Sequence, residues 1–156
     1  MSPGAAGTLI VGYGNSLRSD DGLGWHVVER LAQDARLQGA SVLWRHQLTP
    51  ELAHDIGRSS LVVLIDVSVE QEPGVIAVRR LEATSSTGSA WSHHVDPESL
   101  VALARELWNA SPDVFVVSVG AGSLEVGERL SPAVEAALPN VVETVVGLVT
   151  AHDVGT

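Results

Sequence analysis

Short apolar segments alternate with amphipathic segments along the chain, which is typical of a fold built from strands and helices in turn. Leu9-Ile10-Val11 and the run from Leu61 to Ile65 are continuously apolar, as expected for parallel strands that are covered on both faces. From Leu23 to Arg36 apolar residues instead recur at three- and four-residue steps, which predicts a helix. Strands are predicted over residues 8–11, 41–45, 61–65, 74–81 and 114–119, and helices over 23–36 and 50–56, after Asp96-Pro97 and after Ser131-Pro132.

The order of these elements predicts one α/β domain over residues 1–156, a three-layer sandwich with a mostly parallel, twisted sheet and helices on both faces. The weakly alternating segment from Gly74 to Leu81 is expected as an antiparallel edge strand. Pro139 is expected to kink or split the last helix, and residues 1–7 are expected to be flexible. The first strand should lie beside both the second and the third, so the crevice between the first and third strands is the expected ligand-binding switch point.

Composition narrows the classes of function. The chain has 9 Lys and Arg residues against 19 Asp and Glu residues, a formal net charge of −10. This acidity argues against nucleic-acid binding, which needs clustered basic residues, and no basic run is present to bind an anionic membrane. The chain has no cysteine, which removes thiol nucleophiles and disulfides and fits a reducing cytosol. We therefore expect a cytoplasmic protein without a membrane partner.

Three loops at the predicted crevice carry metal-ligating residue types. Asp20 and Asp21 follow the first strand, Asp66 ends the third, and His93-His94 precede the helix that opens at Asp96. Two carboxylates and an imidazole suit a divalent transition metal such as zinc, nickel or iron. Asp66 is the hardest of them to explain otherwise, because a carboxylate that ends so apolar a strand loses hydration unless it is paired or bound.

These residues also have ordinary structural explanations. Asp20 and Asp21 could simply favour the start of the first helix, and Gly12-x-Gly14 is most often a tight turn. Two adjacent histidines cannot easily bind one metal, so one of them is expected to be structural. A dinucleotide site is disfavoured, because Leu17 stands where the fingerprint requires glycine and because the two aspartates would repel a pyrophosphate. His46, at the end of the second strand, could line the crevice.

The segment from Gly12 to Gly24, GYGNSLRSDDGLG, resembles the N-terminal signature of the nickel–iron hydrogenase maturation endopeptidases. The resemblance covers roughly Thr8 to Thr150. Later motifs follow in the family's order, namely Leu64-Ile65-Asp66, Ser92-His93 ahead of a helix, and Glu125-Val126-Gly127 with Leu130-Ser131-Pro132.

The resemblance implies an endopeptidase that removes a C-terminal peptide from the precursor of a nickel–iron hydrogenase large subunit after nickel insertion. The family's metal-contacting residues, an acid, an Asp and a His, correspond here to Asp21, Asp66 and His93, with His94 as the alternative if the register differs by one residue. The first acid is often Glu, so Asp21 is shorter by one methylene. The three residues would contact nickel already seated in the precursor, rather than hold it permanently, and would also serve catalysis.

A substrate-binding surface is expected beside these ligands, formed by Gly14, Asn15, Asp20, His46 and His94. A carboxylate that does not contact the metal, Asp20 or Asp66, could act as general base. Two other classes of function stay open at this point. One is a small-ligand-binding α/β module without chemistry, and the other is a nickel-handling chaperone that does not cleave its partner.

Overall fold

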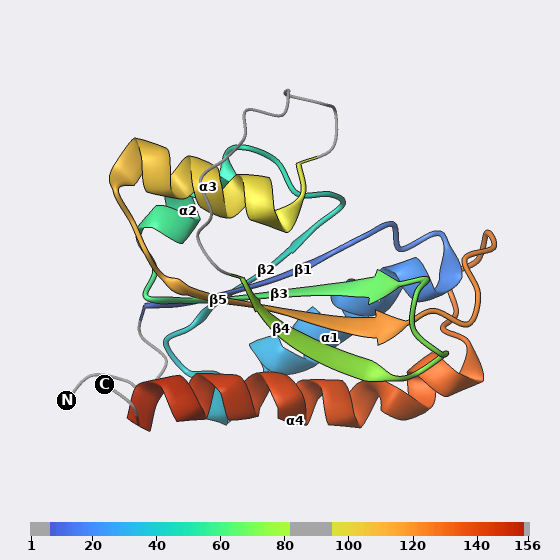
Figure 1. The fold of residues 1–156 in the computed structure, drawn as a ribbon. Coiled ribbons are helices and arrows are strands. Elements are labelled where there is room, and N and C mark those ends of the chain that lie inside the picture. Colours follow the sequence, from blue (N-terminus) through green and yellow to red (C-terminus); the bar gives the residue numbers. More distant parts are fainter. Residues whose placement is uncertain (1–6, 82–94, 155–156) are drawn as a thin grey trace.

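A five-stranded sheet forms the centre of the computed structural model, which describes residues 7–81 and 95–154 (Figure 1). The strand order is β2-β1-β3-β5-β4, with every neighbouring pair parallel except β4 and β5. The strands are β1 (Thr8–Tyr13), β2 (Ser41–Arg45), β3 (Leu61–Ser68), β4 (Ile76–Leu81) and β5 (Asp113–Gly120). The helices are α1 (Leu23–Ala32), α2 (Leu52–Gly57), α3 (Pro97–Trp108) and α4 (Pro132–Val154), with 3-10 turns η1 (Ser19–Gly22) and η2 (Ala35–Leu37).

Helices cover both faces of the sheet, so the predicted fold class is confirmed. α1 and α4 pack on one face and α2 and α3 on the other (Figure 1). Successive residues of a strand point to opposite faces, so Ile10 and Val63 pack under α1 and α4, whereas Val11 and Leu64 pack under α2 and α3. The predicted antiparallel edge strand is confirmed as β4, and β1 lies between β2 and β3 as expected.

The four parallel strands all end at the same side of the sheet. We call the loops that follow β1, β2, β3 and β5 the carboxyl edge. In the register of β1 and β3, Gly12 lies beside Ile65, so the next residues, Tyr13 and Asp66, lie side by side. Tyr13 is the last residue of β1, and Asp66 lies within β3, which continues to Ser68. Both continue the alternation of Val11, so both belong to the face that α2 and α3 cover. The sheet thus brings the end of β1 next to the end of β3.

Two predicted helix features differ from the structure. The first helix ends at Ala32 rather than Arg36, because the Asp34 side chain accepts a hydrogen bond from the Arg36 amide and starts the η2 turn. The predicted split of the last helix at Pro139 is wrong, since α4 runs without interruption. Pro139 and Glu135, whose carbonyl loses its partner, are both exposed, so water can satisfy that carbonyl while the opposite face stays packed.

α4 is apolar because it lies along the sheet. Within Pro132–Asp153 an 18-residue window has a mean hydropathy of 1.4, enough by length and composition alone to cross a membrane. In this fold, however, one face of the helix joins the core through Val134, Leu138 and Val141, and through further valines in its C-terminal half. The structure therefore explains this hydropathy by burial against β1, β3 and β5.

The closest approach of α1 to β1 depends on two glycines. A Cβ on Gly24 would lie 2.7 Å from the amide nitrogen of Tyr13 and 3.0 Å from the carbonyl carbon of Gly12, and neither backbone atom can give way cheaply. We expect Gly24→Ala to lower the free energy of unfolding by about 1–3 kcal/mol through overpacking. Gly147→Ala is the matched control, because it is also helical but nothing lies within 4 Å of its Cβ. It should raise stability by about 0.5–1 kcal/mol, and equal urea midpoints for the two variants would contradict the expected difference.

Candidate functional site

Asp66 is held at the end of β3 by the phenol of Tyr13. The Tyr13 hydroxyl donates a hydrogen bond to Asp66 Oδ2 at 2.6 Å, and the two residues come from neighbouring strands. Asp66 is half-buried at the end of a strand whose first five residues are fully buried. The second oxygen, Oδ1, has no hydrogen-bond partner among the described residues, so it is the oxygen that this arrangement leaves available to a ligand.

Asp21 is held in a similar way by the loop that follows β1. Its Oδ2 accepts a hydrogen bond from the amide of Asn15 at 2.8 Å. This approach requires glycine at position 14, which has φ +141°, and a Cβ there would overlap the carbonyl oxygen of Asp21. The Asn15 side chain accepts in turn from the amide of Leu17 at 2.9 Å. Gly14 and Asn15, two of the predicted substrate-binding residues, therefore shape the loop that positions Asp21.

Asp21 lies close enough to Asp66 to affect the pKa of the Asp66 carboxyl group. Burial raises the pKa of Asp66 above its usual value, and the negative charge of Asp21 raises it further. The hydrogen bond from Tyr13 and the positive charge of Arg79 act in the opposite direction. Burial and the neighbouring Asp66 charge also raise the pKa of Tyr13, so the phenol remains a donor. A divalent cation, or a proton taken up from the solvent by Asp66, would relieve the repulsion between Asp21 and Asp66.

Tyr13 was not singled out by the sequence, although it stands inside the motif that predicted Asp21. We expect Tyr13→Phe to raise the pKa of Asp66 further, because the hydrogen bond from the phenol favours the charged carboxylate. The measurement is a pH titration of the Asp66 carboxyl carbon by NMR, with Tyr13→Phe compared with the wild type. A lower pKa of Asp66 in the variant, or no change, would show that Tyr13 does not stabilise the charged form.

Asp20 has a different environment from Asp21, although the two are adjacent. Its side chain is fully buried and accepts four hydrogen bonds, from the amides of Gly122 and Ser123 and from both the amide and the hydroxyl of Ser131, at 2.6 to 2.8 Å. It thereby joins the loop after β1 to the loop after β5 and to the start of α4. This geometry argues against the predicted substrate contact, and against a general-base role, for Asp20.

The predicted histidines are not brought together with the two aspartates among the described residues. His46 is exposed and follows β2 at the same carboxyl edge, but no hydrogen bond or ion pair joins it to Asp21 or Asp66 within residues 7–81 and 95–154. His93 and His94, and the predicted loop from Glu82 to Ser92, lie outside the described residues. Within the described ranges no group of three potential ligands could hold a metal ion.

An exposed ion pair lies on the same face of the sheet as Tyr13 and Asp66. Arg79 of β4 and Glu98, in the first turn of α3, meet at 2.8 Å. Arg79 lowers the pKa of Asp66 and Glu98 raises it, with the effect of Arg79 the larger. This pair joins β4 to α3, and α3 itself starts as predicted, with Pro97 in its first turn and the Asp96 side chain accepting from the Ser99 amide at 2.7 Å.

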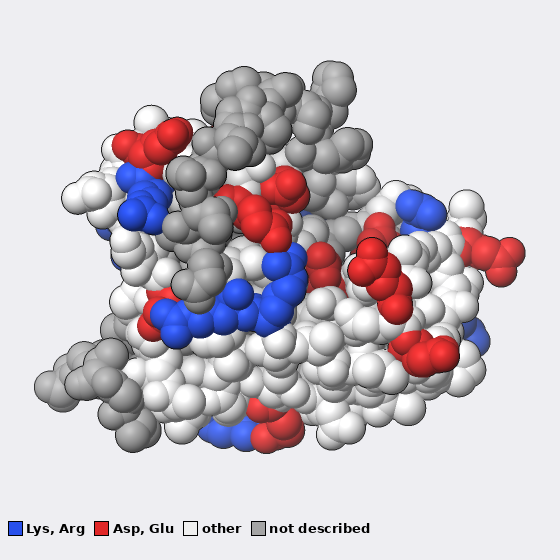
Figure 2. Space-filling model, in the orientation of Figure 1, with Lys and Arg blue, Asp and Glu red and all other residues white. Residues whose placement is uncertain are grey.

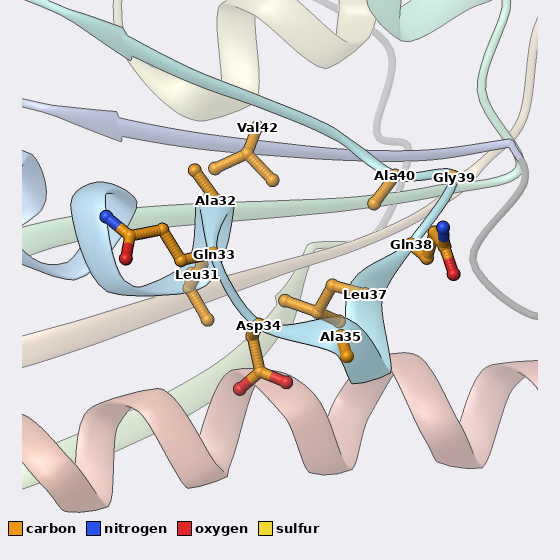
Figure 3. A pocket seen from close by; sticks show the side chains of 10 residues that line it. All are labelled: Leu31, Ala32, Gln33, Asp34, Ala35, Leu37, Gln38, Gly39, Ala40 and Val42. Carbon is orange, nitrogen blue, oxygen red and sulfur yellow. The ribbon is translucent and has the colours of Figure 1, made fainter.

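A pocket of about 500 Å³ lies at the opposite end of the sheet from Asp21 and Asp66 (Figure 3). It is bounded by the end of α1, by η2 and by the start of β2, and its walls include Leu31, Leu37 and Val42. Its one carboxylate, Asp34, is already engaged by the guanidinium of Arg36 at 2.8 Å. The pocket contains none of the predicted site residues, so the candidate chemistry stays with the two aspartates of the carboxyl edge.

Comparison with known proteins identifies the fold. No protein-family model matches the sequence, and no curated protein matches it. Among solved structures, a hydrogenase 2 maturation peptidase from Thaumarchaeota archaeon SCGC_AB-539-E09 is 25% identical over 90% of this chain and 96% of its own, with a TM-score of 0.68. The hydrogenase maturating endopeptidase HybD of E. coli is 22% identical over 93% of each chain, with a TM-score of 0.66.

A third structure extends the likeness to another archaeon. The [NiFe] hydrogenase maturation protease HycI from Thermococcus kodakarensis KOD1 is 21% identical over 91% of each chain, with a TM-score of 0.70. The coverage is nearly complete in both directions for all three proteins, so the whole chain has the fold of hydrogenase maturation proteases. This agrees with the resemblance carried by the GYGNSLRSDDGLG segment.

Proposed function

We propose that this chain is an endopeptidase that removes the C-terminal peptide from the nickel-loaded precursor of a nickel–iron hydrogenase large subunit. The observation that carries the proposal is that Asp21, in the loop after β1, lies near enough to Asp66 of β3 to raise its pKa, and that each has one oxygen held by a hydrogen bond from the protein. The fold likeness to hydrogenase maturation proteases supports the choice of substrate.

Asp21, Asp66 and His93 are proposed to contact the nickel ion that the precursor already holds. Carboxylate and imidazole are both suitable ligands for nickel, and one oxygen of each aspartate is left without a protein hydrogen bond among the described residues. A shared contact of this kind needs fewer ligands from the protease than a permanent site does, because the precursor supplies the others. Nickel is therefore part of the substrate, and the protease tests whether it has been inserted.

The chemistry requires a polarised carbonyl and a base that activates water. The substrate's metal can polarise the scissile carbonyl or lower the pKa of a bound water. Of the two carboxylates considered as general base, Asp66 fits better than Asp20. Both oxygens of Asp20 already accept hydrogen bonds from the loop after β5 and from Ser131 at the start of α4. Asp66 has a raised pKa and keeps one oxygen free, both of which suit a proton acceptor at neutral pH. While that oxygen accepts the proton, it does not contact the nickel, and the contact is left to Asp21 and His93. We place the reaction in the cytoplasm, as the absence of cysteine suggests.

The test is cleavage of the precursor itself. The chain is incubated with the purified large-subunit precursor of its source organism, once loaded with nickel and once without it, and the products are weighed by mass spectrometry. We expect loss of a C-terminal peptide from the nickel-loaded precursor only. Binding of the precursor without any loss of mass would favour the chaperone alternative, and cleavage of both forms equally would show that nickel is not sensed.

A further inference from the structure

The most exposed aliphatic side chains of the carboxyl edge stand on three different loops. Leu17 follows β1, Val69 follows β3 and Val126 follows β5, and they are 59%, 76% and 92% exposed. Exposed aliphatic surface is hydrated unfavourably, so a partner that covers these side chains gains free energy. Their position suggests a role in binding, because the same loops carry or position Asp21 and Asp66.

Leu17 and Val126 belong to loops that are held firmly together. The Gly127 amide donates to the carbonyl of Leu17 at 2.9 Å, and the Ser19 amide donates to the carbonyl of Gly127 at 2.7 Å. The Ser19 hydroxyl also donates to the carbonyl of Glu125 at 2.6 Å. We call these two joined loop segments, with Leu17 and Val126, the platform. Because the platform is already ordered, the loops lose little conformational entropy when a partner covers the two side chains.

The platform is connected directly to the candidate catalytic carboxylate. The Leu17 amide donates to the Asn15 side chain, and the Asn15 amide donates to Asp21. Asp20 fixes the other side of the platform through its hydrogen bonds to the loop after β5. A partner seated on Leu17 and Val126 would therefore be held at a defined distance from Asp21.

The carboxyl edge is strongly acidic around this platform. Its loops, together with the last three residues of the strands that they follow, contain eight carboxylates against three arginines, and Figure 2 shows acidic side chains outnumbering basic ones on the right-hand side, where the strands end. The acids are Asp20, Asp21, Glu51, Asp66, Glu70, Glu72, Glu125 and Glu128, and the arginines are Arg18, Arg45 and Arg129. A second copy of this chain, itself at −10, is therefore a poor partner for the edge, whereas a basic segment is attracted to it.

We propose that Leu17 and Val126 form a docking point for a basic segment of the protein substrate that carries an aliphatic side chain. The aliphatic side chain packs on Leu17 and Val126, and flanking Lys or Arg side chains lie against the acids of the edge. This inference rests on the proposed function, because the occupant is the same precursor whose peptide bond is cut beside Asp21 and Asp66. It adds the chemical character of the segment that the precursor must present.

The chain offers a closely matched control for the apolar contact. Leu107, near the end of α3, is 59% exposed like Leu17, but it lies away from the carboxyl edge. We expect Leu17→Ser and Val126→Ser each to raise KM for the nickel-loaded precursor roughly 10-fold, the effect of truncating an interface residue that contributes strongly to the binding free energy, while kcat is retained. Leu107→Ser should leave both constants unchanged. Thermal melting of every variant confirms folding, and Val126→Ser covers the case in which Leu17→Ser fails to fold.

The charge contribution is tested with a second matched pair. Glu128→Gln, at the carboxyl edge, should raise KM, and Glu106→Gln, exposed near the end of α3, should not. Values of KM unchanged in Leu17→Ser and Val126→Ser, or raised equally in Leu107→Ser, would overturn the docking point. If the wild-type chain itself neither binds nor cleaves the precursor, the proposed function fails instead, so the two failures are distinguishable.

Discussion

Asp66→Asn is expected to abolish cleavage of the precursor and, at the same time, to make the folded protein more stable at neutral pH. The loss of activity should be about 100-fold or more, because an amide cannot accept the proton from water and is a weaker metal ligand than a carboxylate. The gain in stability follows from burial, since the carboxylate loses hydration at the end of β3 and receives one hydrogen bond, from Tyr13. An Asn side chain has no charge to desolvate, and its oxygen can accept the same hydrogen bond.

The effect of pH on stability has a definite sign. The pKa of Asp66 is raised in the folded protein above its ordinary value of 3.8, so the folded state keeps this proton to a higher pH than the unfolded state does. The contribution of Asp66 to stability is therefore greatest below about pH 3.8 and is lost as the pH rises through the folded pKa. Asp66→Asn removes this loss, so its advantage over the wild type should grow between acidic and neutral pH.

Thermal melting from acidic to neutral pH measures this difference, and the precursor assay measures the activity of the same samples. Asp34→Asn is a control of opposite sign, because Arg36 lowers the pKa of Asp34 to about 2 and the charged form is the favoured one. Asp34 should thus contribute a small stability at neutral pH that its Asn variant lacks. If the Asp66→Asn protein melts at a lower temperature than the wild type at pH 7, the charged carboxylate does not destabilise the folded state.

Much of this site is readable from the sequence because it lies at the ends of buried parallel strands. The uninterrupted apolar run of β3 predicts both its central place in the sheet and an unusual environment for the aspartate that follows. The loop after β1 is predicted in the same way from its glycines and acids. Tyr13 and Asp66 are 53 residues apart, and nothing in the residues between them predicts their contact. The parallel pairing of β1 and β3 brings them together.

The partners of Asp20 could not be predicted from the sequence. All four of its hydrogen bonds come from groups more than a hundred positions away, three of them backbone amides and the fourth the hydroxyl of Ser131. Backbone amides are present at nearly every residue, so a carboxylate that binds them leaves no pattern of residue types. The predicted split of the last helix at Pro139 was wrong for a similar reason. Whether Pro139 lies on the exposed side of α4 depends on how the helix packs, which the sequence does not show.

Asp20→Asn is expected to lower the free energy of unfolding by about 3–5 kcal/mol, because hydrogen bonds to a buried charge are each worth more than those to a neutral group. Both oxygens of Asp20 accept from N–H or O–H donors, so the amide group of Asn must place its own N–H groups against those donors. For a chain of this length the melting temperature should fall by roughly 6–20 °C. Asp55→Asn, an exposed aspartate of α2, should change stability by about 0.5 kcal/mol or less.

The destabilised loops are also the ones that present Leu17 and Val126, so Asp20→Asn should affect activity through KM more than through kcat. Measured well below its melting temperature, the variant should retain slow cleavage, whereas Asp66→Asn should show almost none at any temperature. This contrast separates a carboxylate that holds the carboxyl edge together from one that acts on the substrate. An Asp20→Asn protein as stable as the wild type but without cleavage would assign Asp20 to the chemistry, against the four hydrogen bonds that bind it to its own chain.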